Sequence, residues 1–467
     1  MKRQAWRAVL MLVPALAAFS LVPATTSALP KIPAQSFQSA ITCNCHRTQY
    51  EQWESSMHAK ALFDPVYVTK KIEADKATDG GLGLFCDTCH TPIGTMSGQT
   101  TTKKLSLQSR EGVTCDFCHQ AVGTAKTPPG DASMELVADG TKRAQFSDAV
   151  APGHKTAYSA FHESAEFCGT CHNLVHPTTG VKLDDTYDQW KAGPYSGAGI
   201  VCQDCHMTPG PGEPPQPGRA GSMGPIRDRI YLMTFSGANV PLGDPERARV
   251  VLSRAATIDL SVPEVLARGE QGTVDVRVTN TGAGHAIPAG VAEIRQMWLE
   301  VNAVNPDGTT RLLGKRQFGT VFRDANGNYP VQLWDAVAIQ SDDRIPPKGS
   351  VDVSYSLPMD SETSVTVEAV LNYRSFPDDL ARKAGVANPV TVMARSQATV
   401  YASESLLRQA ERVARRSDQS WLFSEGGATT AVVAAVALLL VALALFFFLR
   451  RRRRKKSARS EGPLGEM

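Results

Sequence analysis

Four stretches of the chain share one pattern, in which two cysteines stand three positions apart and a histidine directly follows the second. Cysteines at this spacing reach the two vinyl groups of one haem as thioethers, and the histidine is then held under the iron as its proximal ligand. The pattern therefore predicts four covalently attached haems of the c type. Their residues are Cys86, Cys89 and His90; Cys115, Cys118 and His119; Cys168, Cys171 and His172; and Cys202, Cys205 and His206.

Zinc and disulfide bonds are the alternative uses of these cysteines. A structural zinc site gathers four ligands from two knuckles and gives no reason for a histidine after every cysteine pair. Disulfides suit an exported protein, but they leave the histidines unexplained. Both alternatives therefore account for less of the pattern than haem does.

A fifth copy of the pattern, Cys43-Asn44-Cys45-His46, lacks one residue between its cysteines. Cys45 and His46 keep the usual adjacency and can hold a haem, which brings the prediction to about five haems c. Cys43 either reaches its vinyl group under strain or stays unbonded. A metal-binding thiol pair and a free thiol are the alternatives at this motif.

Five histidines remain outside the motifs, one for each predicted haem. Two imidazoles per iron give low-spin, six-coordinate haems suited to electron transfer, whereas methionine, lysine or an open position are alternatives at any one iron. A lone histidine is also ordinarily a surface or hydrogen-bonded residue. The candidate distal ligands are His58, His154, His162, His176 and His285.

His285 differs from the other candidates because it lies far along the chain, in the glycine-rich stretch from Gly282 to Gly290. Glycines on both sides allow a tight loop that approaches a planar group closely. We expect this histidine to be donated across a domain interface, and a structural histidine in a glycine-rich turn is the alternative.

Composition along the chain predicts a multidomain protein. All ten cysteines lie in a first region of helices and loops, whereas period-2 alternation such as Val274, Val276, Val278 predicts a β-sandwich beyond it. The predicted divisions are a signal peptide (1–28), a multihaem cytochrome c domain (29–245), a β-sandwich domain (246–402), a helical linker (403–427), a transmembrane helix (428–449) and a basic cytoplasmic tail (450–467).

Two terminal segments predict the location. Residues 1–28 have the basic start, apolar run and small-residue end of a secretory signal. Residues 428–449 carry no charge and would reach about 33 Å as a helix, enough to cross a bilayer. Seven basic residues follow and place that end in the cytoplasm. The sequence thus predicts a single-pass inner-membrane protein with its haem and β-domains on the periplasmic or extracellular side; a buried core helix is the alternative.

Charge excludes one class of partner. The chain has an overall charge of +3, and setting aside the three positive charges of the signal and the net six of residues 450–467 leaves −6 for the remainder. No basic surface or motif for nucleic acid is indicated. An acidic exported part favours a partner that presents a basic face.

The N-terminal region resembles a known family. Cys43 to Tyr50, Trp53, the run Ser55-Ser56-Met57-His58-Ala59, the four motifs and the segment from Cys202 to Met207 are similar to multihaem cytochromes related to the tetrahaem cytochrome of hydroxylamine-oxidising bacteria. The resemblance covers about residues 38–210, and residues 282–290 resemble a segment of β-domains attached to such cytochromes. It implies haems stacked in pairs, mostly with two histidine ligands, and His58 as a distal ligand.

This sequence departs from that family in its shortened first motif, its fifth motif and its C-terminal segment, which leaves haem order and partners open. The favoured function is electron transfer between redox partner proteins or with a quinol-oxidising complex. The alternative is a reductase or oxidase of a small nitrogen or sulfur compound at a haem without two histidines, although no Cys-x-x-Cys-Lys motif occurs. A ligand sensor or adhesive module built on the sandwich is a third class, and no catalytic residue is assigned.

Overall fold

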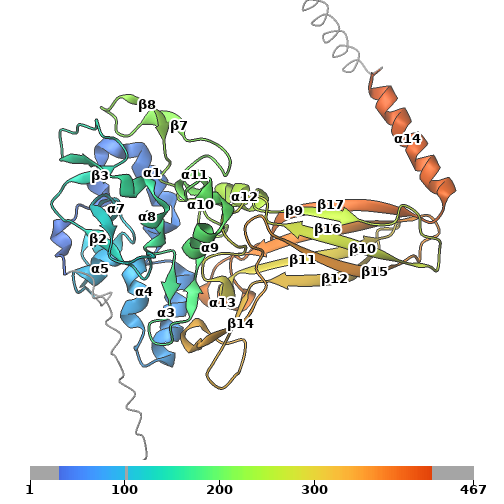
Figure 1. The fold of residues 1–467 in the computed structure, drawn as a ribbon, viewed down its shortest axis with the longest axis horizontal. Helices are drawn as coiled ribbons and strands as arrows, with labels where there is room; N and C mark the ends of the chain where they lie inside the picture. Colours follow the sequence, from blue (N-terminus) through green and yellow to red (C-terminus); the bar gives the residue numbers. More distant parts are fainter. Residues whose placement is uncertain (1–30, 100–103, 423–467) are drawn as a thin grey trace, which may run out of the picture.

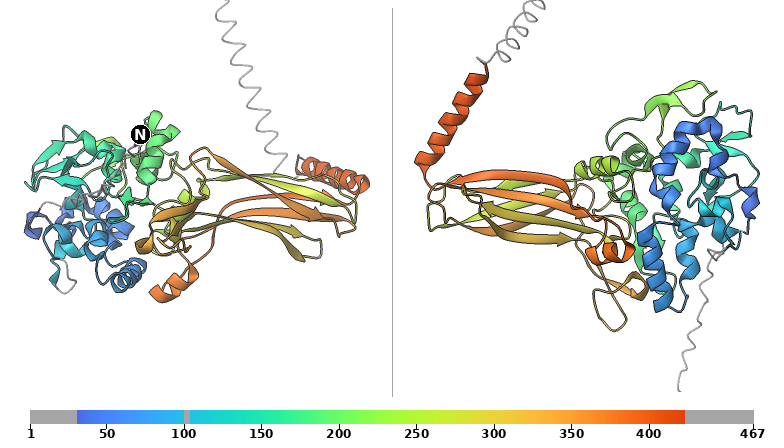
Figure 2. Two further views of the ribbon diagram at one scale, coloured as in Figure 1. Left: turned by 60° about the horizontal axis from the view of Figure 1, so that its bottom comes forward. Right: turned by 180° about the vertical axis from the view of Figure 1, so that it is seen from behind.

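The computed structural model describes residues 31–99 and 104–422 (Figure 1). An N-terminal region of short helices and loops lies against one end of an elongated β-rich region, and the views in Figure 2 agree on this arrangement. The expected order of a helix-and-loop region before a β-rich region is therefore confirmed.

The N-terminal region consists mainly of short α-helices and 3-10 turns joined by loops. The α-helices are α1 (Arg47–Ser55), α2 (Met57–Lys60), α3 (Pro65–Ala77), α4 (Gly83–His90), α5 (Pro92–Met96), α6 (Leu107–Arg110), α7 (Cys115–His119), α8 (Ala165–Gly169), α9 (Thr186–Ala192), α10 (Pro194–Gly197), α11 (Gln203–His206) and α12 (Pro245–Ser253). The 3-10 turns are η1 (Ala34–Ser36), η2 (Ala40–Thr42), η3 (Asn44–His46) and η5 (Ala160–Glu163).

Four two-stranded ribbons accompany these helices. Three of them are antiparallel, and the pair β3 and β4 is parallel. The strands are β1 (Ala121–Thr124), β2 (Met134–Leu136), β3 (Lys142–Ala144), β4 (Thr156–Tyr158), β5 (Leu174–Val175), β6 (Lys182–Asp184), β7 (Gln216–Arg219) and β8 (Ile226–Ile230).

The β-rich region is built from two packed antiparallel sheets, with strand orders β15-β10-β9 and β12-β11-β16-β17. Alternate residues face the shared core, as Val274, Val276 and Val278 do opposite Leu299 and Val301. The strands are β9 (Thr257–Ser261), β10 (Gln271–Thr279), β11 (Gln296–Val304), β12 (Thr310–Phe318), β13 (Thr320–Arg323), β14 (Ala338–Asp342), β15 (Ser350–Pro358), β16 (Ser364–Arg374) and β17 (Thr391–Tyr401), with η6 (Ala292–Ile294), η7 (Leu333–Asp335) and α13 (Asp378–Ala384) between them.

Buried polar and apolar contacts join the two regions. The Arg344 guanidinium donates to both carboxylate oxygens of Asp185, at 2.8 and 3.1 Å, and its side chain is only 5% exposed. Val66 of α3 packs with Phe376 and Leu380 from the far end of the chain. These contacts fix the end of the sandwich against the N-terminal region.

The structure corrects the prediction of a membrane-spanning helix. No helix in the described residues is both long and apolar enough to cross a bilayer. The last one, α14 (Glu404–Leu422), is amphipathic and carries charges such as Glu404, Arg408 and Arg412 along its length. The predicted single-pass location in the inner membrane is corrected with it. Residues 428–449, like the predicted signal and tail, lie outside the described residues.

Candidate haem sites

One continuous cavity of about 1160 Å³ runs through the N-terminal region and reaches the sandwich. This exceeds the 300–1,000 Å³ of an ordinary small-molecule pocket. All ten cysteines and nine of the ten histidines line it. The apolar clusters of this region are small and lie around the cavity, with Phe37, Ile93, Met96 and Phe117 in one of them. The space that side chains would fill in an ordinary core is therefore shaped for something else.

Local helical geometry presents the motif side chains to this cavity. Residues three apart lie on one face of a helix, so the cysteine pair of α4 or α7 points to the same side. Four motif histidines have Nδ1 within hydrogen-bond distance of a backbone carbonyl, which leaves Nε2 free to bind a metal. The contacts are His46 with Ala220 (2.5 Å), His90 with Ala61 (2.8 Å), His119 with Arg143 (2.8 Å) and His206 with Ser236 (2.6 Å).

Four motif histidines face a second histidine at a nearly constant distance. Two imidazoles that each bind one metal at about 2.0–2.1 Å, with the ring centre about 1.2 Å beyond the nitrogen, have centres about 6.4 Å apart. The donor set therefore fits an iron between each pair. The ring-centre distances are 6.1 Å for His46 and His154, 6.4 Å for His58 and His172, 5.8 Å for His119 and His162, and 6.3 Å for His206 and His285.

The protonation state of three of these imidazoles also suits metal binding. Burial lowers the pKa of His58 to about 3 and the pKa of His162 and His206 to about 4, so all three are neutral ligands near pH 7. His162 Nδ1 is buried without a hydrogen-bond partner, while its Nε2 contacts the Cys118 carbonyl at 3.0 Å. A buried nitrogen without a partner, on a ring that lies 5.8 Å from the His119 ring, is explained if it holds a metal.

His285 reaches the cavity from the sandwich. Its loop follows β10 and is held by Asn280, whose side-chain amide donates to the His285 carbonyl (2.8 Å), and by Gln189 of α9, which accepts from the Ala286 N–H (2.7 Å). Glycine is required in this loop because a Cβ at Gly282 would overlap the Arg254 carbonyl oxygen. The structure thus brings His285 to His206 across the domain interface.

Comparison with known proteins agrees with this geometry. The family of cytochrome c554 and c-prime matches residues 42–120, which hold the first three motifs. The penta-haem cytochrome c552 from Thermochromatium tepidum is similar over 79% of this chain and 100% of its own, with 21% identity and a TM-score of 0.59, a likeness of fold. These findings support a multihaem c-type cytochrome.

Other solved structures resemble only part of the chain. The CARDB domain of the PF1109 protein from Pyrococcus furiosus has 15% identity over 31% of this chain and 91% of its own, with a TM-score of 0.17. A putative superoxide reductase from Thermotoga maritima has 14% identity over 33% and 90%, with a TM-score of 0.18. Scores this low carry no argument. No curated protein matches the chain.

One motif of the cytochrome has no histidine opposite it among the described residues. The His90 ring stacks on Tyr67, with centres 3.7 Å apart and planes inclined by 6°. The Tyr67 hydroxyl donates to Asp87 at 2.6 Å, and burial with that carboxylate raises the pKa of Tyr67. Tyr67 therefore fixes the orientation of His90, a role that the sequence analysis missed because no spacing rule links the two residues.

His176 is the one histidine that does not line the cavity. Its Nδ1 accepts from the backbone N–H groups of Thr178 (3.3 Å) and Thr179 (3.2 Å), and its Nε2 lies 3.2 Å from the Trp334 carbonyl. Both ring nitrogens are thus satisfied by a local turn and by the sandwich. We leave His176 out of the ligand set for this reason.

The shortened first motif holds its two cysteines differently. Cys45 is exposed, whereas Cys43 is partly buried beside Cys115 of a neighbouring motif. A hydrogen bond between the two thiols lowers the pKa of Cys43 and raises the pKa of Cys115. Both cysteines of the motif line the cavity, so the structure keeps Cys43 within the site.

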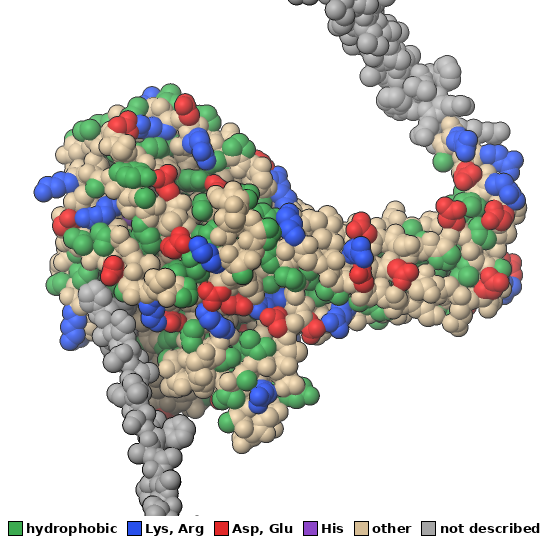
Figure 3. All heavy atoms as spheres, in the orientation of Figure 1, with side chains coloured by type: hydrophobic (Ala, Val, Ile, Leu, Met, Phe, Trp, Pro, Cys, Tyr) green, Lys and Arg blue, Asp and Glu red, His purple; other side chains and the backbone are tan. Residues whose placement is uncertain are grey.

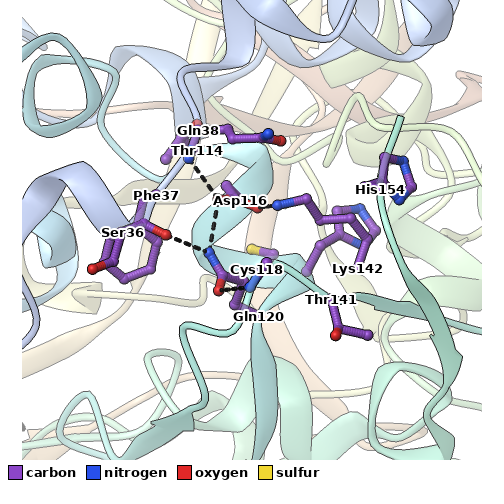
Figure 4. A network of polar contacts seen from close by, with 12 residues as sticks. Ser36, Phe37, Gln38, Thr114, Asp116, Cys118, Gln120, Thr141, Lys142 and His154 are labelled. Carbon is purple, nitrogen blue, oxygen red and sulfur yellow. Dashed lines mark hydrogen bonds and ion pairs between the residues drawn. The ribbon is translucent and has the colours of Figure 1, made fainter. Parts of the chain in front are cut away.

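A buried polar network supports the motif of Cys115, Cys118 and His119 and is centred on Asp116 (Figure 4). Asp116 is 3% exposed, accepts from the Gln38 N–H (2.6 Å) and the Gln120 amide (2.7 Å), and forms an ion pair with Lys142. Lys142 begins β3, whose Arg143 carbonyl contacts His119. Asp116 therefore positions the proximal histidine through β3, and only its place inside a motif could have marked it in the sequence.

Proposed function

We propose that this chain carries electrons between redox partner proteins through five covalently attached haems c. The observation that carries the proposal is the set of four histidine pairs, 5.8–6.4 Å apart, that line one cavity with all ten cysteines. Haem iron with two imidazoles changes between the ferric and ferrous states without gaining or losing a ligand. The protein residues hold those imidazoles in fixed orientations, so little rearrangement opposes electron transfer.

The haem count is tested by intact mass and a pyridine haemochrome assay on the purified protein. We expect five haems per chain, added as covalent mass. A count of four would remove the first motif from the proposal, and a colourless protein without added mass would refute it.

A second candidate function is favoured by one observation, which is that the His90 ring forms a ring contact with Tyr67 and with no described histidine. This motif favours a reductase or oxidase of a small nitrogen or sulfur compound, because an axial position that no protein side chain fills would be open to an external ligand. Cyanide titration of the oxidised protein tests this point, with saturation at about one equivalent per chain expected. Steady turnover of nitrite, hydroxylamine or tetrathionate would then favour a catalytic function over electron transfer alone.

A further inference from the structure

The first motif lies closer to solvent than the others. Cys45 is exposed, whereas the other nine cysteines are partly buried. Met223 lines the cavity and yet is 68% exposed, so it marks a mouth of the cavity. His46 and His154 line the same part of the wall, which places the first haem site next to solvent.

The hairpin of β7 and β8 packs directly on this motif. Besides the contact of His46 with Ala220, the Ser222 N–H donates to the Cys45 carbonyl at 2.7 Å. Arg227 of β8 pairs with Asp148 at 2.7 Å and so ties the hairpin to the loop that leads to His154. Figure 1 shows the hairpin at the upper edge of the region, beside α1 and β3.

The face around the first motif is unusually apolar for a solvent-exposed surface. The three most exposed large hydrophobic side chains of the described residues all lie here: Val150 (92%), Met223 (68%) and Ile226 (66%). Ile41, two positions before Cys43, is 61% exposed. Clustered exposed apolar side chains mark interaction surfaces. We call these four residues and the hairpin the hairpin face.

Charge on the hairpin face is opposite in sign to the net charge of residues 29–449. Residues 38–47, 146–156 and 219–231 contain five basic and two acidic side chains, against a net −6 for residues 29–449. Arg47 pairs with Glu51 and Arg227 with Asp148. The charged residues of these ranges that lie outside the two pairs are three basic ones, Lys155, Arg219 and Arg229, and one acidic one, Asp228. Figure 3 shows basic, acidic and hydrophobic side chains mixed at this end of the region.

We propose that the hairpin face is the docking surface for a small electron-transfer protein whose own face is acidic. This inference rests on the proposed electron-transfer function and names its partner by charge. It differs from the basic partner expected from net charge, because it uses the local charge around the first motif. Basic side chains steer an acidic partner, and apolar contacts at the centre exclude water. Complexes of this kind are small, below about 1,200 Å². One electron passes between the partner's redox centre and the first haem site, with no bond made or broken and no proton moved.

The test uses the complete haem-loaded protein and an acidic plant-type [2Fe–2S] ferredoxin as the probe. Stopped-flow absorbance gives the second-order rate of haem reduction by reduced ferredoxin, and calorimetry gives the dissociation constant of oxidised ferredoxin. Lys155→Glu and Arg229→Glu should each slow reduction about tenfold at low ionic strength, an effect that high salt removes. Val150→Ser should weaken binding at every salt concentration. Arg395→Glu, an equal charge change on the exposed face of β17, is the control and should change neither value.

Dithionite separates the two ways in which the test can fail. If dithionite does not reduce the haems reversibly, the electron-transfer function itself fails. If dithionite reduces wild type and variants alike, and ferredoxin also reduces them all at one rate, the hairpin face is refuted while the function stands. Faster exchange with a basic c-type cytochrome than with ferredoxin would overturn the assigned charge of the partner.

Discussion

Replacement of His285 by alanine should change the spin state of one haem and leave the rest unaffected. The His285 ring lies 6.3 Å from the His206 ring and is inclined to it by 14°, as expected for two ligands of one iron. No other described histidine forms a ring contact with His206, so the variant leaves that iron with one protein ligand. The variant should therefore have three haem sites with a histidine pair, where the wild type has four.

Electron paramagnetic resonance of the oxidised protein measures this change. The high-spin ferric signal should rise from about one haem per chain, the His90 site, to about two, and the low-spin signal should fall by about a quarter. Added imidazole should restore the low-spin signal, because it can occupy the vacated axial position. The return of the low-spin signal with imidazole also distinguishes loss of the ligand from unfolding.

His176→Ala is the matched control, since this histidine does not line the cavity. Gly282→Ala should reproduce part of the His285→Ala spectrum, because its Cβ would overlap the Arg254 carbonyl oxygen and displace the loop. An unchanged spectrum for His285→Ala, or an equal change for His176→Ala, would refute the ligand assignment.

Three further predictions concern other parts of the molecule. Burial raises the pKa of Glu293 from its ordinary 4.5 to about 7, so between these values the folded protein keeps a proton that the unfolded chain releases. The free energy of unfolding should therefore fall by about 3 kcal/mol as pH rises from about 4.5 through 7. Glu293→Gln should flatten this pH dependence, which denaturant unfolding at pH 5 and pH 8 measures. Asp116→Asn leaves Lys142 without its buried partner and should lower the free energy of unfolding by about 3 kcal/mol, whereas loss of the exposed pair through Asp352→Asn should cost less than about 1 kcal/mol. Cys43→Ser should retain every haem by intact mass, while Cys45→Ser should lose one, and loss of a haem from Cys43→Ser would show that its thiol is needed for attachment.

Local patterns could be predicted from the sequence because their physics is local. Two cysteines and a histidine of one motif lie within five consecutive residues, as in α7 (Cys115–His119), so their spacing alone identifies the chemistry. The alternation of Val274, Val276 and Val278 likewise reflects one strand with one buried face. The order of the strands and the register of β11 with β16 depend on contacts between distant segments, which the pattern does not contain.

The pairing of histidines could not be predicted by counting. Five spare imidazoles matched five motifs, yet His176 is held by the backbone of Thr178 and Thr179, a turn formed by its own neighbours. His58 faces His172 across more than a hundred residues of chain. The membrane span at residues 428–449 was also predicted from composition alone, and no described helix provides such a span.

The unpaired site at His90 is where the two candidate functions differ physically. A histidine pair fills both axial positions with protein groups, so the other four sites can exchange electrons but offer no position for a substrate. At His90 the structure supplies an orienting aromatic ring, Tyr67 of α3, whose hydroxyl donates to the Asp87 carboxylate of the motif helix α4. These groups constrain the proximal ligand, and no described histidine takes the opposite position. An electron carrier does not need an axial position open to substrate, so a test of external ligand binding at the His90 site decides whether the chain only transfers electrons or also catalyses a reaction.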